Sequence, residues 1–149
     1  MTNALQVKIE FEISEIDKLL SKADVLISKC KNVAPDFIEL CAAASILHSY
    51  YNGIESIFVL IAKNIDKKVF DTNAWHKNLL QSMFESNEKR YAVLHIELKE
   101  KLINYLGFRH FFRHSYGHEI EWEKARNLFL GLHDNWKEVK TDIIKFLLK

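Results

Sequence analysis

Residues that interrupt helices are almost absent from this chain, whose 149 residues include only four glycines and one proline. Average usage, about 7% glycine and 5% proline, would give roughly 18 such residues in a chain of this length. A β-sandwich or β-barrel joins many short strands and needs far more turns than this chain can make. The shortage therefore excludes an all-β fold and favours a small number of long helices.

Two long apolar stripes have helical spacing, with alternating steps of three and four residues. The first comprises Phe37, Leu40, Ala44, Leu47, Tyr51, Ile54, Phe58, Ile61 and Ile65, and the second comprises Trp122, Ala125, Phe129, Leu132, Trp136, Val139, Ile143 and Phe146. At 3.6 residues per turn, each stripe predicts one helix of roughly eight turns. Pro35 and Asp36 mark the start of the first helix, and we expect the proline in its first turn.

Three further segments complete the expected bundle. A short helix is expected over residues 75–83 after the capping cluster 71–73, and a long one from about residue 87 to 116, with Gly117 as its stop. Residues 5–13 alternate as a strand would, but a lone strand would lack a partner, so we expect the N-terminal segment to be helical. The sequence thus predicts an all-α fold, an antiparallel bundle of about five helices in one domain, 1–149.

Net charge, apolar stretches and cysteine positions indicate which partners and which cellular compartment to expect. The 21 Lys and Arg against 20 Asp and Glu give a net charge of +1, which argues against binding nucleic acid through overall charge but leaves a local basic cleft open. The longest uncharged stretch, residues 40–54, is too short to span a bilayer, and the N-terminus lacks the apolar region of a signal peptide. Cys30 and Cys41 fall in apolar helical patterns, which indicates buried, reduced thiols. We therefore expect a soluble, cytoplasmic protein.

An arginine interrupts the apolar face of the fourth predicted helix. The stripe there runs through Leu98, Leu102, Tyr105, Arg109, Phe112 and Tyr116. Because an unpaired buried guanidinium is costly, we expect this face to meet a partner charge, a cleft or another subunit. Arg113 follows one turn after Arg109, and His110, His114 and His118 lie on the adjacent stripe. Permanent cations beside imidazoles and a phenol are suited to binding and cleaving a phosphodiester.

Two other interpretations of this segment stay open. Arginine and histidine are favoured near a helix C-terminus by the helix dipole, so a solvated, charged helix end would look similar. His110 and His114 also have the i,i+4 spacing of a zinc-binding pair. No third carboxylate or cysteine stands at a supporting spacing, so metal binding is the lesser interpretation. We expect neither a metal nor another cofactor.

Several segments of the chain, taken in order, resemble one protein family. Arg109, His114 and Tyr116 form the pattern Arg-x4-His-x-Tyr, which is the motif of HEPN-domain ribonucleases in the form carried by HepT toxins. Residues 47–58 (LHSYYNGIESIF) and 75–80 (WHKNLL) are also similar to HepT-like segments, as are the residues 108–114 around the motif. The likeness runs from about Ala42 to the C-terminus and shows no departure from the motif.

This resemblance implies a metal-independent endoribonuclease that acts on tRNA or mRNA as the toxin of a type VII-like HEPN/MNT toxin–antitoxin system. The partner in such systems is a minimal nucleotidyltransferase (MNT) antitoxin that transfers AMP to the motif tyrosine, here Tyr116. Family members form homodimers in which both motifs face one cleft. The resemblance thus points to Arg109 and His114 as catalytic residues, the first for phosphate oxygens and the second for proton transfer.

Polar residues near the motif are interpreted as its supports. We expect Glu55 to pair with Arg109 or to orient His114, although an exposed position on the flank of its helix stays open. Arg113 and His110 are expected to support the site or to contact the RNA backbone rather than to perform chemistry.

Further residues and two alternative functions stay open. Asn52 is expected to support the same polar cluster, whereas His48 and His76 are either core hydrogen-bonding residues or members of the site. One alternative function is a HEPN module that binds nucleotide or RNA without cleaving it, and the other is an interaction subunit of a nucleotidyltransferase. The intact Arg109 and His114 pair favours the nuclease, because a module that only binds would not need it.

Overall fold

A computed structural model describes all 149 residues, and its regular elements are helices. Its six α-helices are α1 (Asn3–Cys30), α2 (Phe37–Ile61), α3 (Trp75–Ser82), α4 (Lys99–Arg113), α5 (Trp122–Leu130) and α6 (Leu132–Leu147). A π-helical turn, η1 (Ala62–Asp66), extends α2, and two 3-10 turns, η2 (Ile96–Leu98) and η3 (Gly117–Glu119), flank α4. No strand is present, so the all-α prediction is confirmed, and the ambiguous N-terminal segment is part of α1.

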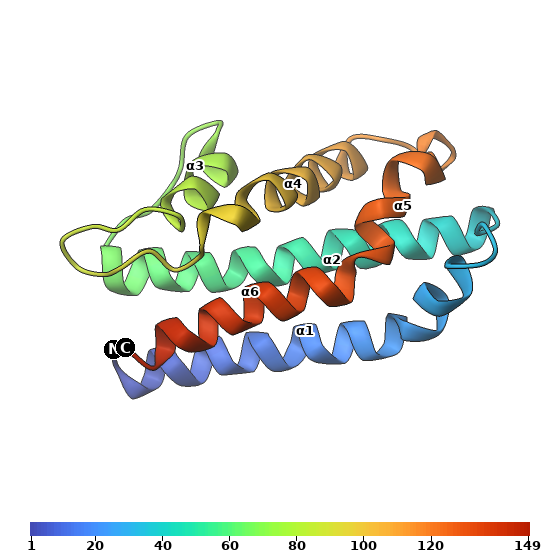
Figure 1. Cartoon of the computed structure of the whole chain (residues 1–149). Coiled ribbons are helices and arrows are strands. Elements are labelled where there is room, and N and C mark those ends of the chain that lie inside the picture. The colour runs from blue at the N-terminus through green and yellow to red at the C-terminus, as the bar shows by residue number, and fades with distance from the viewer.

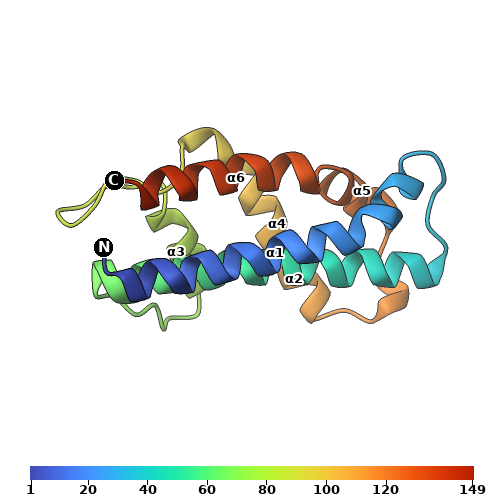
Figure 2. The ribbon, with the colours of Figure 1, turned by 90° about the horizontal axis from the view of Figure 1, so that it is seen from below.

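The long helices run alternately in opposite directions. In Figure 1, α1 and α4 run one way and α2 and α6 run the other, so the two chain termini lie at the same end. Figure 2, seen from below, shows α6 alongside α1 and α2, while α3 and α4 cover the far side of α2. The core of 35 buried residues draws on every helix. Helix α2 packs against α1, α3, α4 and α5 and is therefore the centre of the antiparallel bundle.

Two helix starts differ in detail from the expectation. Helix α2 begins after Asp36, whose side chain accepts from the Glu39 N–H (2.8 Å) while the Glu39 carboxylate accepts from the Asp36 N–H (3.0 Å). Pro35 therefore precedes this capping box. The prediction that it lies in the first turn of the helix was wrong. Helix α3 begins after Ala74 without a side-chain cap, so the expected capping by residues 71–73 is also wrong.

The C-terminal stripe forms two helices, so the prediction of one helix of eight turns was wrong. The break falls at Gly131, where a Cβ atom would lie only 2.9 Å from the carbonyl oxygen of Asn127. The hydroxyl of Tyr105 donates to the carbonyl of Leu128 (2.7 Å), in the last turn of α5 before the break. The apolar spacing continues across the break because both helices cover the same core, and this hides the break in the sequence.

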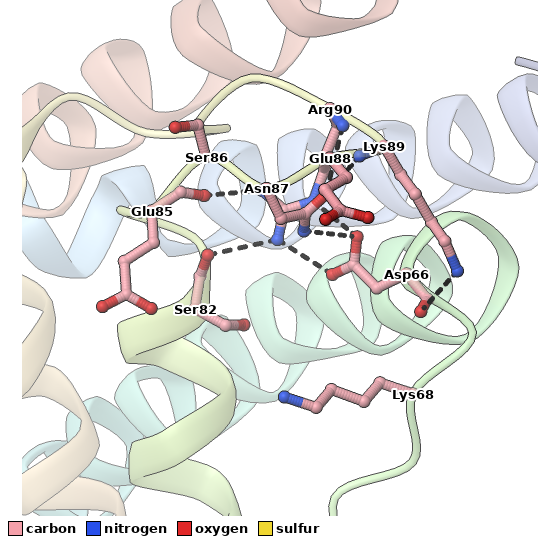
Figure 3. Close-up of a pocket in the computed structure, with 9 residues that line it drawn as sticks. All are labelled: Asp66, Lys68, Ser82, Glu85, Ser86, Asn87, Glu88, Lys89 and Arg90. Atoms are coloured by element: carbon pink, nitrogen blue, oxygen red, sulfur yellow. Dashed lines mark hydrogen bonds and ion pairs between the residues drawn. The ribbon is translucent and has the colours of Figure 1, made fainter.

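The start predicted for the fourth long helix, near residue 87, was also wrong, because residues 84–95 form a loop held by one arginine. Arg90 pairs with Asp66 at the end of η1 through Nε (2.8 Å) and Nη2 (2.9 Å), as Figure 3 shows. The side chain of Arg90 is only 3% exposed. Its other three N–H groups donate to the backbone carbonyls of Ser82, Glu85 and Tyr91. All five guanidinium donors are thus used, and the loop is fixed in place of a longer helix.

The C-terminal end of α4 also comes earlier than expected. The helix ends at Arg113, and His114 leaves the helical region with φ −114° and ψ 10°. The next turn is stabilised by Glu119, whose carboxylate accepts from the Tyr116 N–H (2.8 Å). Gly117 opens this 3-10 turn and is not the C-terminal stop of the helix.

Two smaller expectations concern thiols and membranes. Cys30 is buried and Cys41 is half-buried, and both are free thiols. No helix has the length together with the apolar character that crossing a bilayer requires.

Candidate functional site

Arg109 lies on the inward face of α4 and points toward α2, with its side chain only 10% exposed. Its Nε donates to the Oδ1 of Asn52 at 2.5 Å. Its Nη2 lies 4.0 Å from the Oε1 of Glu55, within ion-pair range but too far for a hydrogen bond. The arginine that interrupts the apolar stripe thus meets a partner charge across the helix contact.

Glu55 is held chiefly by a residue of α3. Its side chain is 8% exposed, and both carboxylate oxygens lie within hydrogen-bonding distance of the Nδ1 of His76 (2.9 and 2.8 Å). The ring of Trp75 stacks on the His76 ring with centroids 3.6 Å apart. Glu55 is therefore buried, not on an exposed flank, and it makes no contact with His114, the other partner that we had considered.

His48 completes the cluster on the other side of Asn52. The Nδ2 of Asn52 lies 3.4 Å from the Nδ1 of His48, and the His48 ring lies 5.1 Å from the ring of Phe112. Burial lowers the pKa of His48, and the positive charges of Arg109 and Arg113 lower it further, so the neutral imidazole is favoured. We call the following five side chains the polar row: His48, Asn52, Arg109, Glu55 and His76.

The two buried arginines of the chain use their donors very differently. Arg90 has a protein acceptor for each of its five N–H groups, whereas the guanidinium of Arg109 makes a single hydrogen bond, to Asn52. The terminal nitrogens of Arg109 form no hydrogen bond within the protein. They are not fully buried, so solvent reaches them. This cation is fixed in direction and keeps donors for an anion that approaches from outside.

The remaining motif residues lie on the surface at the end of α4. His110 and His114 are exposed, and their rings lie 4.7 Å apart. Tyr116 is 75% exposed and stacks on His118 with centroids 5.7 Å apart. No hydrogen bond or ion pair joins any of these four residues to Arg109. One chain therefore brings His48, Asn52 and Glu55 together with Arg109, but not His114.

Comparison with known proteins adds one finding to this geometry. The family model described as HepT-like protein matches residues 42–149, which is most of the chain. The chain belongs to the HepT-like family. No curated protein and no solved structure matches it. The match covers the whole polar row and the Arg-x4-His-x-Tyr motif of this HepT-like chain, and leaves α1 outside.

An apolar groove of about 630 Å³ runs beside the polar row of the HepT-like chain, between α1, α2 and α3. Its apolar walls are formed by Val7, Phe11, Val59, Leu60 and Trp75. Glu55 lines the groove, and Lys8 and Glu12 bring two charges to it from α1. The structure contains no group of three or more His, Cys, Asp or Glu side chains placed to hold a metal ion.

Sequence reasoning left His76 open and missed Tyr51. His76 pairs with Glu55 from 21 residues away on another helix, and no local spacing announces such a contact. Tyr51 belongs to the apolar stripe of α2, but its buried hydroxyl lacks a hydrogen-bond partner. Burial and the nearby charge of Glu55 raise the pKa of Tyr51, so the phenol stays neutral.

Proposed function

We propose that this HepT-like protein is a metal-independent endoribonuclease toxin that binds an RNA phosphate with Arg109 and transfers protons with His114. The observation that carries the proposal is the spare donor capacity of Arg109, a buried cation with one of five N–H groups used. A structural arginine is expected to satisfy its donors within the protein, as Arg90 does. Phosphate oxygens suit the planar, forked donors of a guanidinium.

The reaction needs no group beyond these side chains and the RNA itself. His114 accepts the proton of a ribose 2′-hydroxyl, and the 2′-oxygen forms a bond to the adjacent phosphorus. The bond from phosphorus to the 5′-oxygen breaks, and that oxygen takes the proton from the imidazolium of His114, which returns to its neutral form. The products are a 2′,3′-cyclic phosphate and a 5′-hydroxyl. Arg109 stabilises the negative charge that gathers on the non-bridging oxygens.

A second copy of the chain completes the site in this proposal. Arg109 faces α2, whereas His114 follows the end of α4 and makes no hydrogen bond to the arginine. The proposal therefore takes the two groups from different chains. It includes a two-fold dimer in which the histidine of one subunit reaches the arginine of its partner.

Neutralisation is proposed to act at Tyr116. Its side chain is exposed, so an MNT-type nucleotidyltransferase antitoxin can reach the hydroxyl. Transfer of AMP to that oxygen would add bulk and negative charge close to the end of α4 that carries His114. RNA phosphate would then be excluded by occupancy and by repulsion.

The test is cleavage of total tRNA and mRNA in EDTA by the purified wild-type protein and by His114→Ala and Arg109→Ala. Both variants should lose at least about 100-fold in rate, as is typical for the removal of an acid–base group or of a charge-stabilising donor. A mixture of the two variants should regain activity if dimers share their sites. RNA binding without cleavage by the wild type would instead support the alternative, a HEPN module that only binds.

A further inference from the structure

We propose that His76 is a positioning residue that holds Glu55 away from Arg109 and so keeps the arginine available for a phosphate. This inference rests on the proposed function, because it concerns the same phosphate-binding arginine. His76 itself touches neither the RNA nor the reacting atoms. Its role is to determine whether the buried carboxylate of Glu55 pairs with the imidazole of His76 or with the guanidinium of Arg109.

The distances show that the carboxylate is currently engaged by the histidine. Both oxygens of Glu55 lie within 2.9 Å of the His76 Nδ1, whereas the gap to the Arg109 Nη2 is 4.0 Å. A charged N–H···O contact between a guanidinium and a carboxylate normally closes to about 2.7–2.9 Å. The carboxylate thus stops roughly 1 Å short of the contact that it would make with a free arginine.

No other side chain holds Glu55 in this position. His76 is the only residue that forms a hydrogen bond to its carboxylate. The other charged groups near it are Lys8 and Glu12, which line the groove from α1 and make no ion pair with it. Losing the histidine would leave a buried carboxylate with Arg109 as its remaining partner, and the side chain would turn toward that cation.

Such a turn would mask the arginine. A carboxylate that accepts two parallel N–H bonds uses the same terminal donors that a phosphate needs, and it cancels the charge. The stacking of Trp75 on the imidazole ring restrains His76 at the start of α3. This restraint explains how a histidine that is 25% exposed can hold a carboxylate that is 8% exposed.

The experiment measures the affinity of the full-length protein for a 2′-O-methyl RNA oligomer, which lacks the attacking hydroxyl, by fluorescence anisotropy. His76→Ala should raise Kd about tenfold, within the range usual for coupled sites. His76→Asn, whose amide N–H stands near the position of Nδ1, should bind like the wild type. Adding Glu55→Gln to His76→Ala should bring Kd back to within about twofold of the wild type, because a neutral amide cannot pair with the arginine as a carboxylate does.

His95→Ala is the matched control. His95 also pairs with a carboxylate through Nδ1, but its partner is Asp142 on α6, and neither residue contacts the polar row. This variant should leave Kd unchanged. If His76→Ala does not fold, His76→Phe keeps an aromatic ring against Trp75 while removing the donor, and it should weaken binding to the same extent.

The proposal is overturned if the double variant binds as weakly as His76→Ala, because the histidine would then support the fold and not the arginine. Absence of RNA binding by the wild type would instead refute the proposed function. In that case a crystal structure of His76→Ala still decides this inference. The distance from the Arg109 Nη2 to the Glu55 carboxylate should close to about 2.9 Å. An unchanged gap would show that His76 does not set it.

Discussion

Replacing each buried arginine by methionine should show which arginine stabilises the fold and which one serves RNA cleavage. The two differ because the Arg90 guanidinium makes five hydrogen bonds within the protein and that of Arg109 makes one. Arg90→Met removes five hydrogen bonds and leaves the Asp66 carboxylate, whose side chain is 7% exposed, without its cation. Removal of one partner of a buried pair costs about 3–5 kcal/mol. Arg109→Met removes one hydrogen bond, and the carboxylate of Glu55 keeps its histidine partner.

The loss at Arg109 is offset by a second effect, since an apolar side chain of similar length no longer requires a buried charge to be desolvated. We therefore expect the free energy of unfolding of Arg109→Met to lie within about 1 kcal/mol of the wild type. For a chain of this size, 1 kcal/mol corresponds to a shift of about 2–4 °C in Tm. Arg90→Met should thus lower Tm by roughly 6–20 °C, whereas Arg109→Met should change it by less than about 4 °C.

The assay is urea denaturation and thermal melting followed by circular dichroism, with RNA cleavage measured well below both melting temperatures. Arg109→Met should remain folded and lose cleavage, and Arg90→Met should keep cleavage at low temperature. Equal destabilisation by the two substitutions would refute the reasoning. It would show that Arg109 is a structural arginine whose spare donors have no functional meaning.

Three further predictions concern other parts of the chain. Because burial and the charge of Arg113 lower the pKa of His48, the fold should lose stability as the pH falls below about 6.5, the range in which an unfolded histidine gains its proton. NMR titration should show the His48 pKa rising in Arg113→Gln, and an unchanged value would contradict this. Gly131→Ala should lower the free energy of unfolding in urea by about 1–3 kcal/mol, since the new Cβ would crowd the Asn127 carbonyl; wild-type stability would be the contrary result. Tyr116→Phe should keep most of its cleavage but gain no AMP by mass spectrometry when incubated with an MNT antitoxin and ATP; an AMP adduct on this variant would show that another residue is modified.

The helices and their inward faces could be predicted from the sequence because periodicity alone determines them. The residues at which the helices begin and end could not be predicted, because contacts with residues far away in the sequence determine them. Arg90 turns residues 84–95 into a loop by pairing with Asp66, 24 residues away. The hydroxyl of Tyr105 donates to a carbonyl 23 residues away, in the last turn before the break at Gly131. Neither contact leaves a mark in the local spacing of apolar residues.

The polar row was predictable only in part. Arg109 is visible in the sequence because a cation replaces an apolar residue in a regular stripe, and Asn52 lies on the helix packed against it. His76 stayed open because its meaning depends on a carboxylate on another helix. The separation between Arg109 and His114 also depends on structure, since α4 ends one residue before the histidine.

The central claim is that this protein cleaves RNA with its own side chains, and the chemical ends of the RNA fragments test it most directly. RNA incubated with the purified protein in EDTA should yield fragments with 2′,3′-cyclic phosphates and 5′-hydroxyls, and His114→Ala should produce none above background. Fragments with these ends that appear equally with His114→Ala, or no fragments from the unmodified wild-type protein, would contradict the account.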